Sequence, residues 1–390
     1  MRDAVIVEAV RTPVGKGRPG VGALSGTHPV QLLAHTLRTL VDRAGVDPAL
    51  VDDVIGGTVD QVGEQAMNTT RYAVLSAGFP ESVPATTVDR QCGSSQQAVH
   101  FAAQGVLSGA YDMAVACGVE SMSRVPMWSN VPAGADPFGP GIAERYPEGL
   151  VPQGISAELI AAKWSLSREQ MDTYAAESHR RAAAAWDGGL FDAEVAPLNG
   201  VTRDESVRPG TSVEVLGGLK PAYYDPGFAE RFPQIEWNVT AGNASPVNDG
   251  ASAVLITTSE HAARLGLRPL ARLHSFAVTG SDPLLMLTGV IPATEKVLGK
   301  AGLGLADIDL FEVNEAFAAV VLAWLQETGA DPDRLNVHGG AIALGHPLGA
   351  SGTRLMTTLV HAMRARGARF GLQTMCEAGG LANATVLEAL

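Results

Sequence analysis

The chain has 390 residues, 46% hydrophobic and 18% charged, and a net charge of 28 − 41 = −13; this composition excludes a disordered or fibrous chain and, without a dense Lys/Arg run, argues against a nucleic-acid binder. Its three cysteines are too few and too scattered for a disulfide scaffold or a zinc site, which favours a reducing compartment and predicts no bound metal. No apolar run approaches the roughly 18 residues that a membrane-spanning helix needs, so no span is expected.

The first half of the chain, residues 1 to about 119, alternates strands with helices, which predicts an α/β fold. Strands are expected near 4–9, 53–59, 85–88 and 112–117, and helices near 29–44, 65–77 and 93–108. Because the first strand begins almost at once, neither a signal nor a transit peptide is expected. The C-terminal Leu-Glu-Ala-Leu is not a peroxisomal address, and we expect a cytoplasmic protein.

The reactive candidate in this half is Cys92, in the segment Asp89-Arg-Gln-Cys-Gly-Ser. It lies between a predicted strand and a predicted helix, where the helix dipole and free N–H groups are expected to lower the pKa of the thiol. The alternative is a buried cysteine that packs as a small hydrophobe. The local sequence leaves both interpretations open for Cys92, and it favours the packing role for Cys117, which no Gly-Gly pair follows.

An unlike segment at 120–244 interrupts the α/β pattern. It contains clusters of Pro and Gly and one helical stretch near 167–186, for which Ser167 and Gln170 form a predicted capping box. A segment this long needs structure of its own, and we expect a subdomain that covers the substrate. The small, polar run that follows, Thr240-Ala-Gly-Asn-Ala-Ser, fits either a narrow ligand lying along the backbone or a plain turn.

The second half, about 268–390, repeats features of the first at a constant offset of 257 residues (301 − 44). Each copy is predicted to have a helix ended by glycine, a short connector and a strand, and a later helix that begins at a serine. The repeat predicts a duplicated α/β unit. The matched pairs are Ala44 and Ala301, Gly45 and Gly302, Ala49 and Ala306, Asp52 and Asp309, and Ser94 and Ser351.

Three blocks of this half carry polar or reactive side chains. Asn314 follows a predicted strand, where its amide can position a water or an oxyanion, or can cap the next helix. His346 lies before Pro347 in a glycine-rich loop, where it can act as the general base of a thiol or be a surface histidine on a turn. Cys376 follows a strand-like run and precedes Gly379-Gly380. No Lys follows the loop glycines, which excludes a phosphate-binding P-loop.

Taken together, the blocks resemble the thiolase family over essentially the whole chain. The resemblance implies the α/β thiolase fold, in which two similar halves form a five-layered αβαβα core with an inserted loop domain. We expect one half at 1–119 with 245–267, the loop domain at 120–244, and the other half at 268–390. A homodimer or homotetramer is also implied. The matching stretches are Cys92-Gly-Ser, Gly118-Val-Glu-Ser-Met-Ser, Thr240-Ala-Gly-Asn-Ala-Ser, Asn314-Glu-Ala-Phe, Gly339-Gly-Ala-Ile-Ala-Leu-Gly-His-Pro-Leu-Gly-Ala-Ser-Gly, and Cys376 before Gly379-Gly380.

The same resemblance implies the roles of the site residues. Cys92 would be the nucleophile that takes the acyl group, His346 the base that activates it, and Cys376 the acid/base at the acetyl methyl carbon. Asn314 would hold a water that stabilises the enolate oxygen together with His346. The N–H groups of Cys92 and Ala378 would form a second oxyanion hole. Coenzyme A and acyl-CoA thioesters would be substrates, and no permanently bound cofactor is expected.

For the CoA side, the resemblance implies one wall of small and aromatic residues. Three departures from the family pattern bear on it. Ala378 stands where many relatives have Gly, Pro152-Gln153-Gly154 stands where many have His-Met-Gly, and residues 224–238 carry an insertion that is expected to reshape the CoA entrance. The residues expected to contact CoA or the acyl group are Ser245, Ala241, Ala316, Phe317, Tyr223 and Gln153.

The leading function is thiolytic cleavage of 3-ketoacyl-CoA through an acyl-Cys92 intermediate, with ping-pong kinetics. The block around Cys92 resembles bacterial degradative enzymes of fatty acid or steroid side-chain β-oxidation. The alternative is a biosynthetic thiolase that condenses acetyl-CoA to acetoacetyl-CoA. A related condensing enzyme of the β-ketoacyl-synthase type would have His in place of Cys376. A non-catalytic acyl-CoA carrier would not need Cys92, His346, Cys376 and Asn314 together.

Overall fold

A computed structural model describes residues 2–390. Every strand and helix expected in the first half is present, with ends that differ from the prediction by up to four residues. The helix expected at 65–77 begins only at Thr69, because Asn68 caps it, and the strand expected at 112–117 continues to Ser121. The elements are β1 (Val5–Arg11), β2 (Gly15–Lys16), α1 (Pro29–Ala44), β3 (Asp53–Gly57), α2 (Thr69–Ser76), β4 (Ala85–Val88), α3 (Ser94–Ser108), β5 (Met113–Ser121) and β6 (Asn248–Thr257).

The second half confirms the repeat that the sequence predicted. Gly45 and Gly302 both end their helices in the left-handed conformation, with φ of 66° and 68°. Asp52 and Asp309 each accept two main-chain N–H bonds from the start of the neighbouring strand. The elements are α9 (Ser259–Arg264), β7 (Ala271–Gly280), α10 (Val290–Ala301), β8 (Leu310–Val313), α11 (Ala318–Thr328), α12 (Ala341–Leu344), α13 (Ser351–Arg366), β9 (Phe370–Glu377) and β10 (Leu381–Ala389).

The strands follow one hydrogen-bonded path in the order β4-β3-β5-β6-β1-β7-β10-β9-β8, with β2 added beside β6. The two halves of this path mirror one another, and a single parallel bridge between Phe311 and Leu335 stands where the second half would have its counterpart of β4. The halves meet where β1 and β7 pair at only two positions, Val5 with Arg272 and Ile6 with Ala271. The path therefore consists of two similar sheets joined at a short seam.

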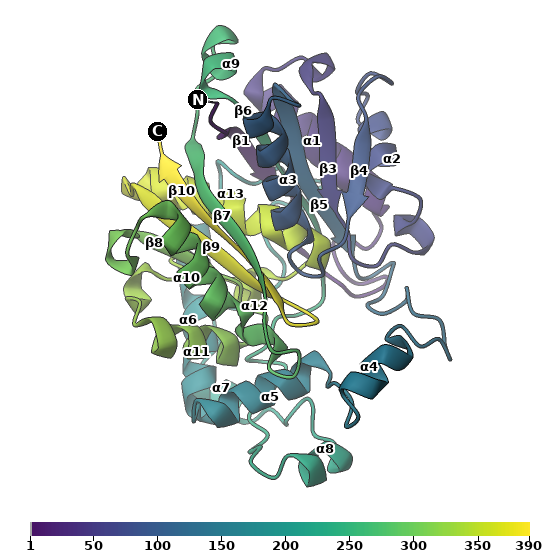
Figure 1. Ribbon diagram of the computed structural model, residues 1–390, viewed down its shortest axis with the longest axis vertical. Coiled ribbons are helices and arrows are strands. Elements are labelled where there is room, and N and C mark those ends of the chain that lie inside the picture. The colour runs from purple at the N-terminus through teal and green to yellow at the C-terminus, as the bar shows by residue number, and fades with distance from the viewer. Residues whose placement is uncertain (1) are drawn as a thin grey trace.

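Helices cover both faces of each sheet. Figure 1 shows α3 and α13 side by side between the two sheets, and they pack on one another and on strands of both halves. Helices α1 and α2 cover the outer face of the first sheet, while α10 and α11 lie on the outer side of the second. Because both faces are covered, β5 and β9 are buried along their whole length. This is the five-layered αβαβα core that the sequence predicted.

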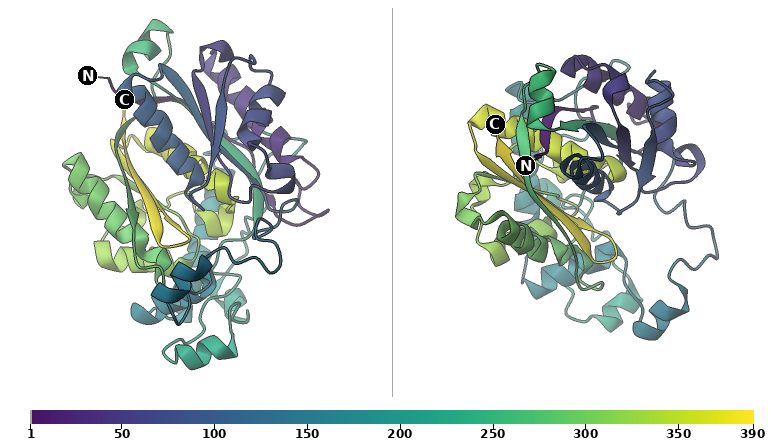
Figure 2. Two further views of the ribbon diagram at one scale, coloured as in Figure 1. Left: turned by 45° about the vertical axis from the view of Figure 1, so that its right-hand side comes forward. Right: turned by 45° about the horizontal axis from the view of Figure 1, so that its top comes forward.

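The segment between the halves forms helices at one end of the core, at the bottom of Figure 1 and of the left view of Figure 2. Ser167 and Gln170 form the expected capping box of the longest one. The insertion at 224–238 holds a short helix, and Phe232 and Trp237 from it pack with Ile155. The domain boundaries stay a prediction. The helices are α4 (Gly139–Arg145), α5 (Gln153–Lys163), α6 (Arg168–Asp187), α7 (Val213–Gly217) and α8 (Pro226–Arg231).

A buried arginine ties this segment to the first sheet. Arg11 of β1 is fully buried, and its guanidinium donates to Glu194 at 2.5 Å and to both carboxylate oxygens of Asp204 at 2.7 and 3.0 Å. It also lies 5.1 Å from the centre of the Phe191 ring. The two carboxylates raise the pKa of Arg11 in spite of its burial.

Across residues 2–390, no helix is long and apolar enough to cross a membrane.

Candidate active site

The candidate residues gather where strands end and helices begin. Cys92 lies on the turn between β4 and α3, Asn314 directly follows β8, and Cys376 lies near the end of β9. His346 lies on the loop that leads into α13. In α/β folds the carboxyl ends of the strands commonly hold the site. The two-sheet arrangement therefore directs residues from both halves to one region.

Cys92 occupies the sharp turn that the sequence predicted. The preceding Gln91 has φ of 48°, a conformation that non-glycine residues seldom adopt, and Gly93 forms the N-cap of α3. The side chain is 5% exposed and packs with Leu348, from the loop of His346, and with Met375, the neighbour of Cys376. Cys92 thus lies close to the candidate residues of the second half, although Cys92 itself belongs to the first half.

The expected lowering of the Cys92 pKa is wrong for this structure. Burial, reinforced by the nearby Glu377, raises the pKa of the thiol to about 12. The helix terminus does not offset the loss of solvation. Cys92 is therefore a neutral thiol near pH 7, and it would need a base to take its proton in order to act as a nucleophile.

Cys376 is a second buried thiol in the same region. Its pKa is raised by burial and by negative charge on Cys92, so the two sulfur atoms lie close enough to interact electrostatically. All three cysteines are free, so no disulfide joins Cys92 to Cys376. Cys117 packs with apolar neighbours in the outer core of the first half, as the sequence predicted.

His346 is a buried imidazole whose protonated nitrogen can be assigned from its neighbours. Ser351 donates its hydroxyl to the carbonyl of Pro347 at 2.8 Å, so it must accept the hydrogen bond of 2.6 Å that joins it to Nδ1 of His346. The proton then lies on Nδ1, and Nε2 keeps a free electron pair. Burial lowers the pKa of His346 to about 3. The imidazole is therefore neutral and able to accept a proton at Nε2.

Asn314 lies beside that free nitrogen. Its Nδ2 is 3.5 Å from Nε2 of His346, a long contact, and its Oδ1 has no partner among the atoms of residues 2–390. The two side chains thus present one donor and one acceptor toward the same space. The Asn314 side chain takes no part in capping α11, whose N-cap is Phe317. The arrangement fits the water-holding role expected of Asn314.

The loop of His346 lies directly on the first sheet because glycines leave room for it. A Cβ on Gly57 or Gly118 would overlap the carbonyl of Gly349. The carboxylate of Glu120 then accepts the N–H groups of Gly349 at 2.8 Å and of Val59 at 2.9 Å. Burial raises the pKa of Glu120 to about 7 in spite of these bonds. Glu120 therefore fixes the loop of the second half to strands of the first.

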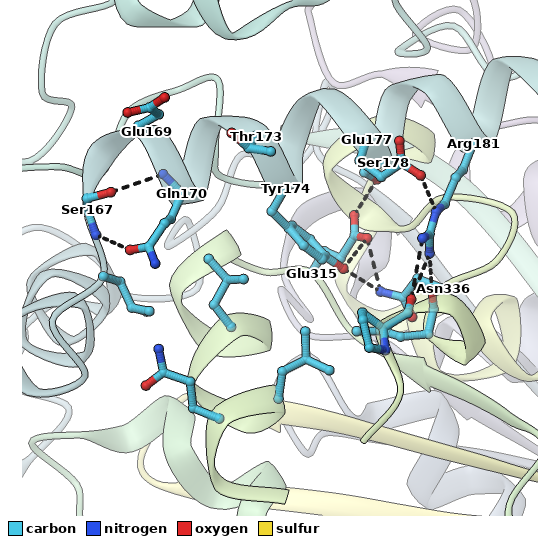
Figure 3. Close-up of a pocket in the computed structure, with 16 residues that line it drawn as sticks. Ser167, Glu169, Gln170, Thr173, Tyr174, Glu177, Ser178, Arg181, Glu315 and Asn336 are labelled. Atoms are coloured by element: carbon cyan, nitrogen blue, oxygen red, sulfur yellow. Dashed lines mark hydrogen bonds and ion pairs between the residues drawn. The ribbon is translucent and has the colours of Figure 1, made fainter. Parts of the chain in front are cut away.

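Glu315, the neighbour of Asn314, holds the same loop from the other side. Its carboxylate accepts from Tyr174 at 2.8 Å, Ser178 at 2.7 Å, Asn336 at 3.0 Å and the N–H of Ile342 at 3.1 Å. Figure 3 shows this network at the inner end of a hollow of about 500 Å³ between α6 and α11. The hollow is lined by none of the candidate catalytic residues. It lies behind the site and is not the site.

Ala378 keeps an ordinary backbone conformation. Among the described residues, Ala378 is not one of the non-glycine residues that have a positive φ, whereas Gly379 and Gly380 have φ of 81° and 78°. The alanine therefore fits where many relatives of the predicted family have glycine. The backbone conformation is thus compatible with the oxyanion role expected of its N–H group.

Most of the residues expected along CoA lie together. The N–H of Ser245 donates to the carbonyl of Ala316 at 2.9 Å, and the rings of Phe317 and Tyr223 meet edge to face at 5.9 Å. Gln153 begins α5, where a Cβ on the next residue, Gly154, would overlap the ring of Tyr223. Ala241 is exposed at the start of the same turn as Ser245.

Sequence analysis missed the residues that hold the site in place. Ser351, Glu120, Glu315 and Asn248, whose Oδ1 accepts the N–H of His346 at 2.9 Å, were given no role. Each is a polar residue in a strongly apolar or glycine-rich stretch, which was the available signal. Glu120, Glu315 and Asn248 have partners that are distant in sequence, and Ser351 meets His346 only through the fold of the loop between them, so the signal could not show what each one binds.

Comparison with known proteins gives one consistent result. The description "Thiolase, N-terminal domain" matches residues 4–260, and "Thiolase, C-terminal domain" matches residues 267–389. A steroid 3-ketoacyl-CoA thiolase of Mycobacterium tuberculosis is 47% identical over all of this chain and 95% of its own. The 3-ketoacyl-CoA thiolases of Klebsiella pneumoniae and Erwinia tasmaniensis are 42% and 43% identical, each over the full length of both chains.

Proposed function

The chain belongs to the thiolase family, and from this premise we propose that it cleaves 3-ketoacyl-CoA with coenzyme A to give acetyl-CoA and a shortened acyl-CoA. As a thiolase it is an acyltransferase whose substrates are CoA thioesters. The names of its relatives support the degradative direction over biosynthetic condensation of acetyl-CoA. The observation that carries the proposal is a neutral His346, with its free Nε2 beside Asn314, on a loop that packs against Cys92.

In the proposed reaction Cys92 attacks the keto carbon of the substrate. Nε2 of His346 takes the thiol proton, because the raised pKa of Cys92 and the lowered pKa of His346 leave both groups neutral at rest. The carbon–carbon bond breaks, and the enolate of acetyl-CoA takes a proton from Cys376. A thiol with a pKa raised by burial holds that proton until the carbanion forms.

Deacylation then regenerates Cys92. The thiol of a second coenzyme A gives its proton to the Cys376 thiolate and attacks the acyl-Cys92 thioester; the bond from the acyl carbon to Cys92 breaks, and the Cys92 thiolate takes back the proton held by His346. The proposed oxyanion donors act in both stages of the reaction. The N–H groups of Cys92 and Ala378 stabilise the acyl oxygen, and Asn314, through a water and together with His346, stabilises the enolate oxygen. The unpartnered Oδ1 of Asn314 and the ordinary backbone of Ala378 support these roles.

We propose that CoA lies along the wall formed by Ser245, Ala316, Phe317 and Tyr223, with Ala241 and Gln153 at its two ends. The contacts among Ser245, Ala316, Phe317 and Tyr223 support a continuous surface. The apolar packing of α8 on α5 borders this wall, which supports a bulky acyl group, fatty or steroid side-chain, rather than acetoacetyl-CoA alone. The absence of disulfides supports a reducing cytoplasm.

A homodimer is the proposed assembly, with a homotetramer as the alternative. Strand β4 ends the sheet path with an unpaired edge, and large apolar side chains lie exposed beside it. Met67 is 79% exposed, and Tyr72 and Phe101 are 47% and 41% exposed. Exposed edges and apolar patches of this kind commonly mark an interface. Light scattering of the purified protein tests the assembly.

Two variants and a substrate series test the reaction. Cys92→Ala is expected to abolish acyl-enzyme formation, whereas Cys376→Ser still becomes acylated by acetyl-CoA but nearly stops carbon–carbon bond cleavage. Full thiolysis by Cys92→Ala would overturn the proposal. Rates with acetoacetyl-CoA against longer and branched 3-ketoacyl-CoA esters give the substrate class, and Cys117→Ala is the matched control, since that thiol only packs in the core.

A further inference from the structure

Glu377 is a buried carboxyl group that the proposed reaction does not use. It is the last residue of β9, directly after Cys376, and its side chain is completely buried. Neighbouring residues of a strand point to opposite faces of the sheet. Cys376 therefore packs in the core of the second half, while Glu377 points toward the start of α3.

The carboxyl of Glu377 lies against the turn of the nucleophile. A Cβ added to Gly93 would overlap Oε1 of Glu377, so the carboxyl group fills the space that a side chain at position 93 would need. Gly93 has φ of −85°, which any residue can adopt. Glycine is therefore required at 93 for space rather than for backbone freedom. The residue next to Cys92 is thus in direct contact with Glu377.

No donor in the described chain satisfies this carboxyl group. Neither oxygen of Glu377 has a hydrogen-bond partner among residues 2–390. The N–H of Asn383 faces this carboxyl group but lies outside hydrogen-bond geometry. Arg90 is a cation that acts on Glu377, yet the two form no ion pair within residues 2–390, and Nε of Arg90 is itself buried without a partner. A carboxylate here would be a nearly uncompensated buried charge.

The remaining charged and titratable groups around Glu377 do not change this balance. Asp89 and Cys92 face it from the turn before α3, Cys376 precedes it on β9, and Glu120 reaches the same region from β5. All four are acids, so Arg90 is the one group of opposite sign. Burial raises the pKa of Glu377 well above its usual range, and Asp89 acts in the same direction.

We propose that Glu377 is a positioning residue, held as a neutral carboxylic acid against the nucleophile turn, and that its ionisation at alkaline pH inhibits acylation of Cys92. The inference rests on the proposed function, since it concerns the acyl transfer to Cys92. A negative charge at this place opposes both the thiolate and the oxyanion that form during acylation. The neutral acid fills the same space without that penalty.

The test compares Glu377→Gln with the wild-type enzyme in the exchange of labelled CoA into acetyl-CoA. The CoA thiol ionises identically in the assays of the two enzymes, so the ratio of their exchange rates reports only on ionisation of protein groups. We expect the ratio of variant to wild type to rise about tenfold as the pH is raised from about 7 to the alkaline limit at which the protein stays folded, because only the wild type acquires the charge. A ratio that stays constant over this range would overturn the proposal, whether its value is one or larger.

Alkylation of Cys92 by iodoacetamide gives a second measurement that needs no turnover. At the pH where the thiol ionises, wild-type Glu377 is charged, so alkylation in Glu377→Gln is expected to begin at lower pH. Coincident alkylation curves would overturn the proposal. Glu377→Met has similar length and no charge, and it is expected to behave as Glu377→Gln does. It keeps the test decisive where the Gln variant folds poorly.

Two controls separate the possible failures. Glu388→Gln removes a carboxyl from β10 that pairs with Arg272 and Arg369, away from Cys92, and its rate ratio is expected to stay constant with pH. If the folded wild-type enzyme does not exchange CoA, the proposed function is contradicted, while the alkylation curves still decide the role of Glu377. A normal exchange with a flat ratio contradicts the inference alone.

Discussion

The hydroxyl of Ser351 fixes which nitrogen of His346 carries the proton. It donates to the carbonyl of Pro347 and so can only accept from Nδ1 of His346, at 2.6 Å. Ser351 is the first residue of α13, and it matches Ser94 at the start of α3 in the repeat. One position of the duplicated unit thus orients the base in the second half, while its counterpart begins the helix that follows the nucleophile.

Replacing Ser351 by Ala is expected to lower kcat for thiolysis by about 10- to 100-fold, because Nδ1 loses the partner that fixes the tautomer. KM is expected to change little, since Ser351 is not part of the proposed CoA wall. Steady-state kinetics with acetoacetyl-CoA measures both constants. Thr357→Ala, later in the same helix, removes a buried hydroxyl that bonds only to a helix carbonyl, and it should leave kcat unchanged. Equal losses in the two variants would contradict the role of Ser351.

Acid is expected to destabilise the protein through its buried histidines. Burial lowers the pKa of His346 and His100 to about 3 and that of His179 to about 4. In the unfolded chain a histidine binds its proton near pH 6.5, so the unfolded state gains protons first as pH falls. The contribution of these histidines to the free energy of unfolding is fully present above about pH 6.5. Below that pH it falls by about 1.4 kcal/mol per pH unit for each histidine.

Urea unfolding between about pH 7 and pH 5 measures this slope. His100→Gln is expected to reduce the slope by one histidine's share, because His100 is buried against Thr385 and Asn383 and takes no part in the reaction. His261→Gln, on the partly exposed helix α9, is the matched control and should leave it unchanged. A slope insensitive to His100→Gln would show that this histidine is not buried in its neutral form.

Removing Arg11 is expected to be more costly than removing an exposed arginine. Arg11→Met leaves Glu194 and Asp204 as buried carboxylates without their cation, which destabilises folding by about 3–5 kcal/mol. Arg2→Met, which breaks a partly exposed pair with Asp112, should cost about 1 kcal/mol or less. Urea unfolding gives both values. Adding Glu194→Gln and Asp204→Asn to Arg11→Met should recover part of the loss, and no recovery would argue against the charge as the cause.

The sequence predicted the fold well because its patterns are local. The helix ends at Gly45 and Gly302 and the capping box at Ser167 depend on neighbouring residues, and the repeat can be found by comparing such local patterns along the chain; the structure confirms them. Element ends were less accurate where a side chain decided them, as at Asn68, which caps α2 by accepting the N–H of Arg71. A cap is an interaction of one side chain, and periodicity does not reveal it.

The prediction of the candidate site likewise succeeded where the signal was local and failed where it depended on distant residues. Cys92, His346, Asn314 and Cys376 stand in short, recognisable motifs, and they come from the turn before α3, the loop before α13, the end of β8 and the end of β9. The charge state of Cys92 was wrong, because burial comes from Leu348 and Met375, which are hundreds of residues away in sequence. Glu120 and Glu377 were missed for the same reason: each contacts the opposite half of the chain, Glu120 through the N–H of Gly349 and Glu377 through the turn at Gly93.

The unequal ends of the strand path limit how copies of this chain can associate. The first half ends in the four-residue strand β4, whereas the second half keeps only the bridge between Phe311 and Leu335 at the matching place. A molecule with two open sheet edges can add copies at both and grow into a fibre. In the second half, the bridge at Leu335 covers part of the edge of β8, whereas no strand covers β4. In the proposed dimer, pairing of β4 with its copy about a two-fold axis would remove the open edge and leave the partly covered one, which offers fewer free backbone groups for further growth.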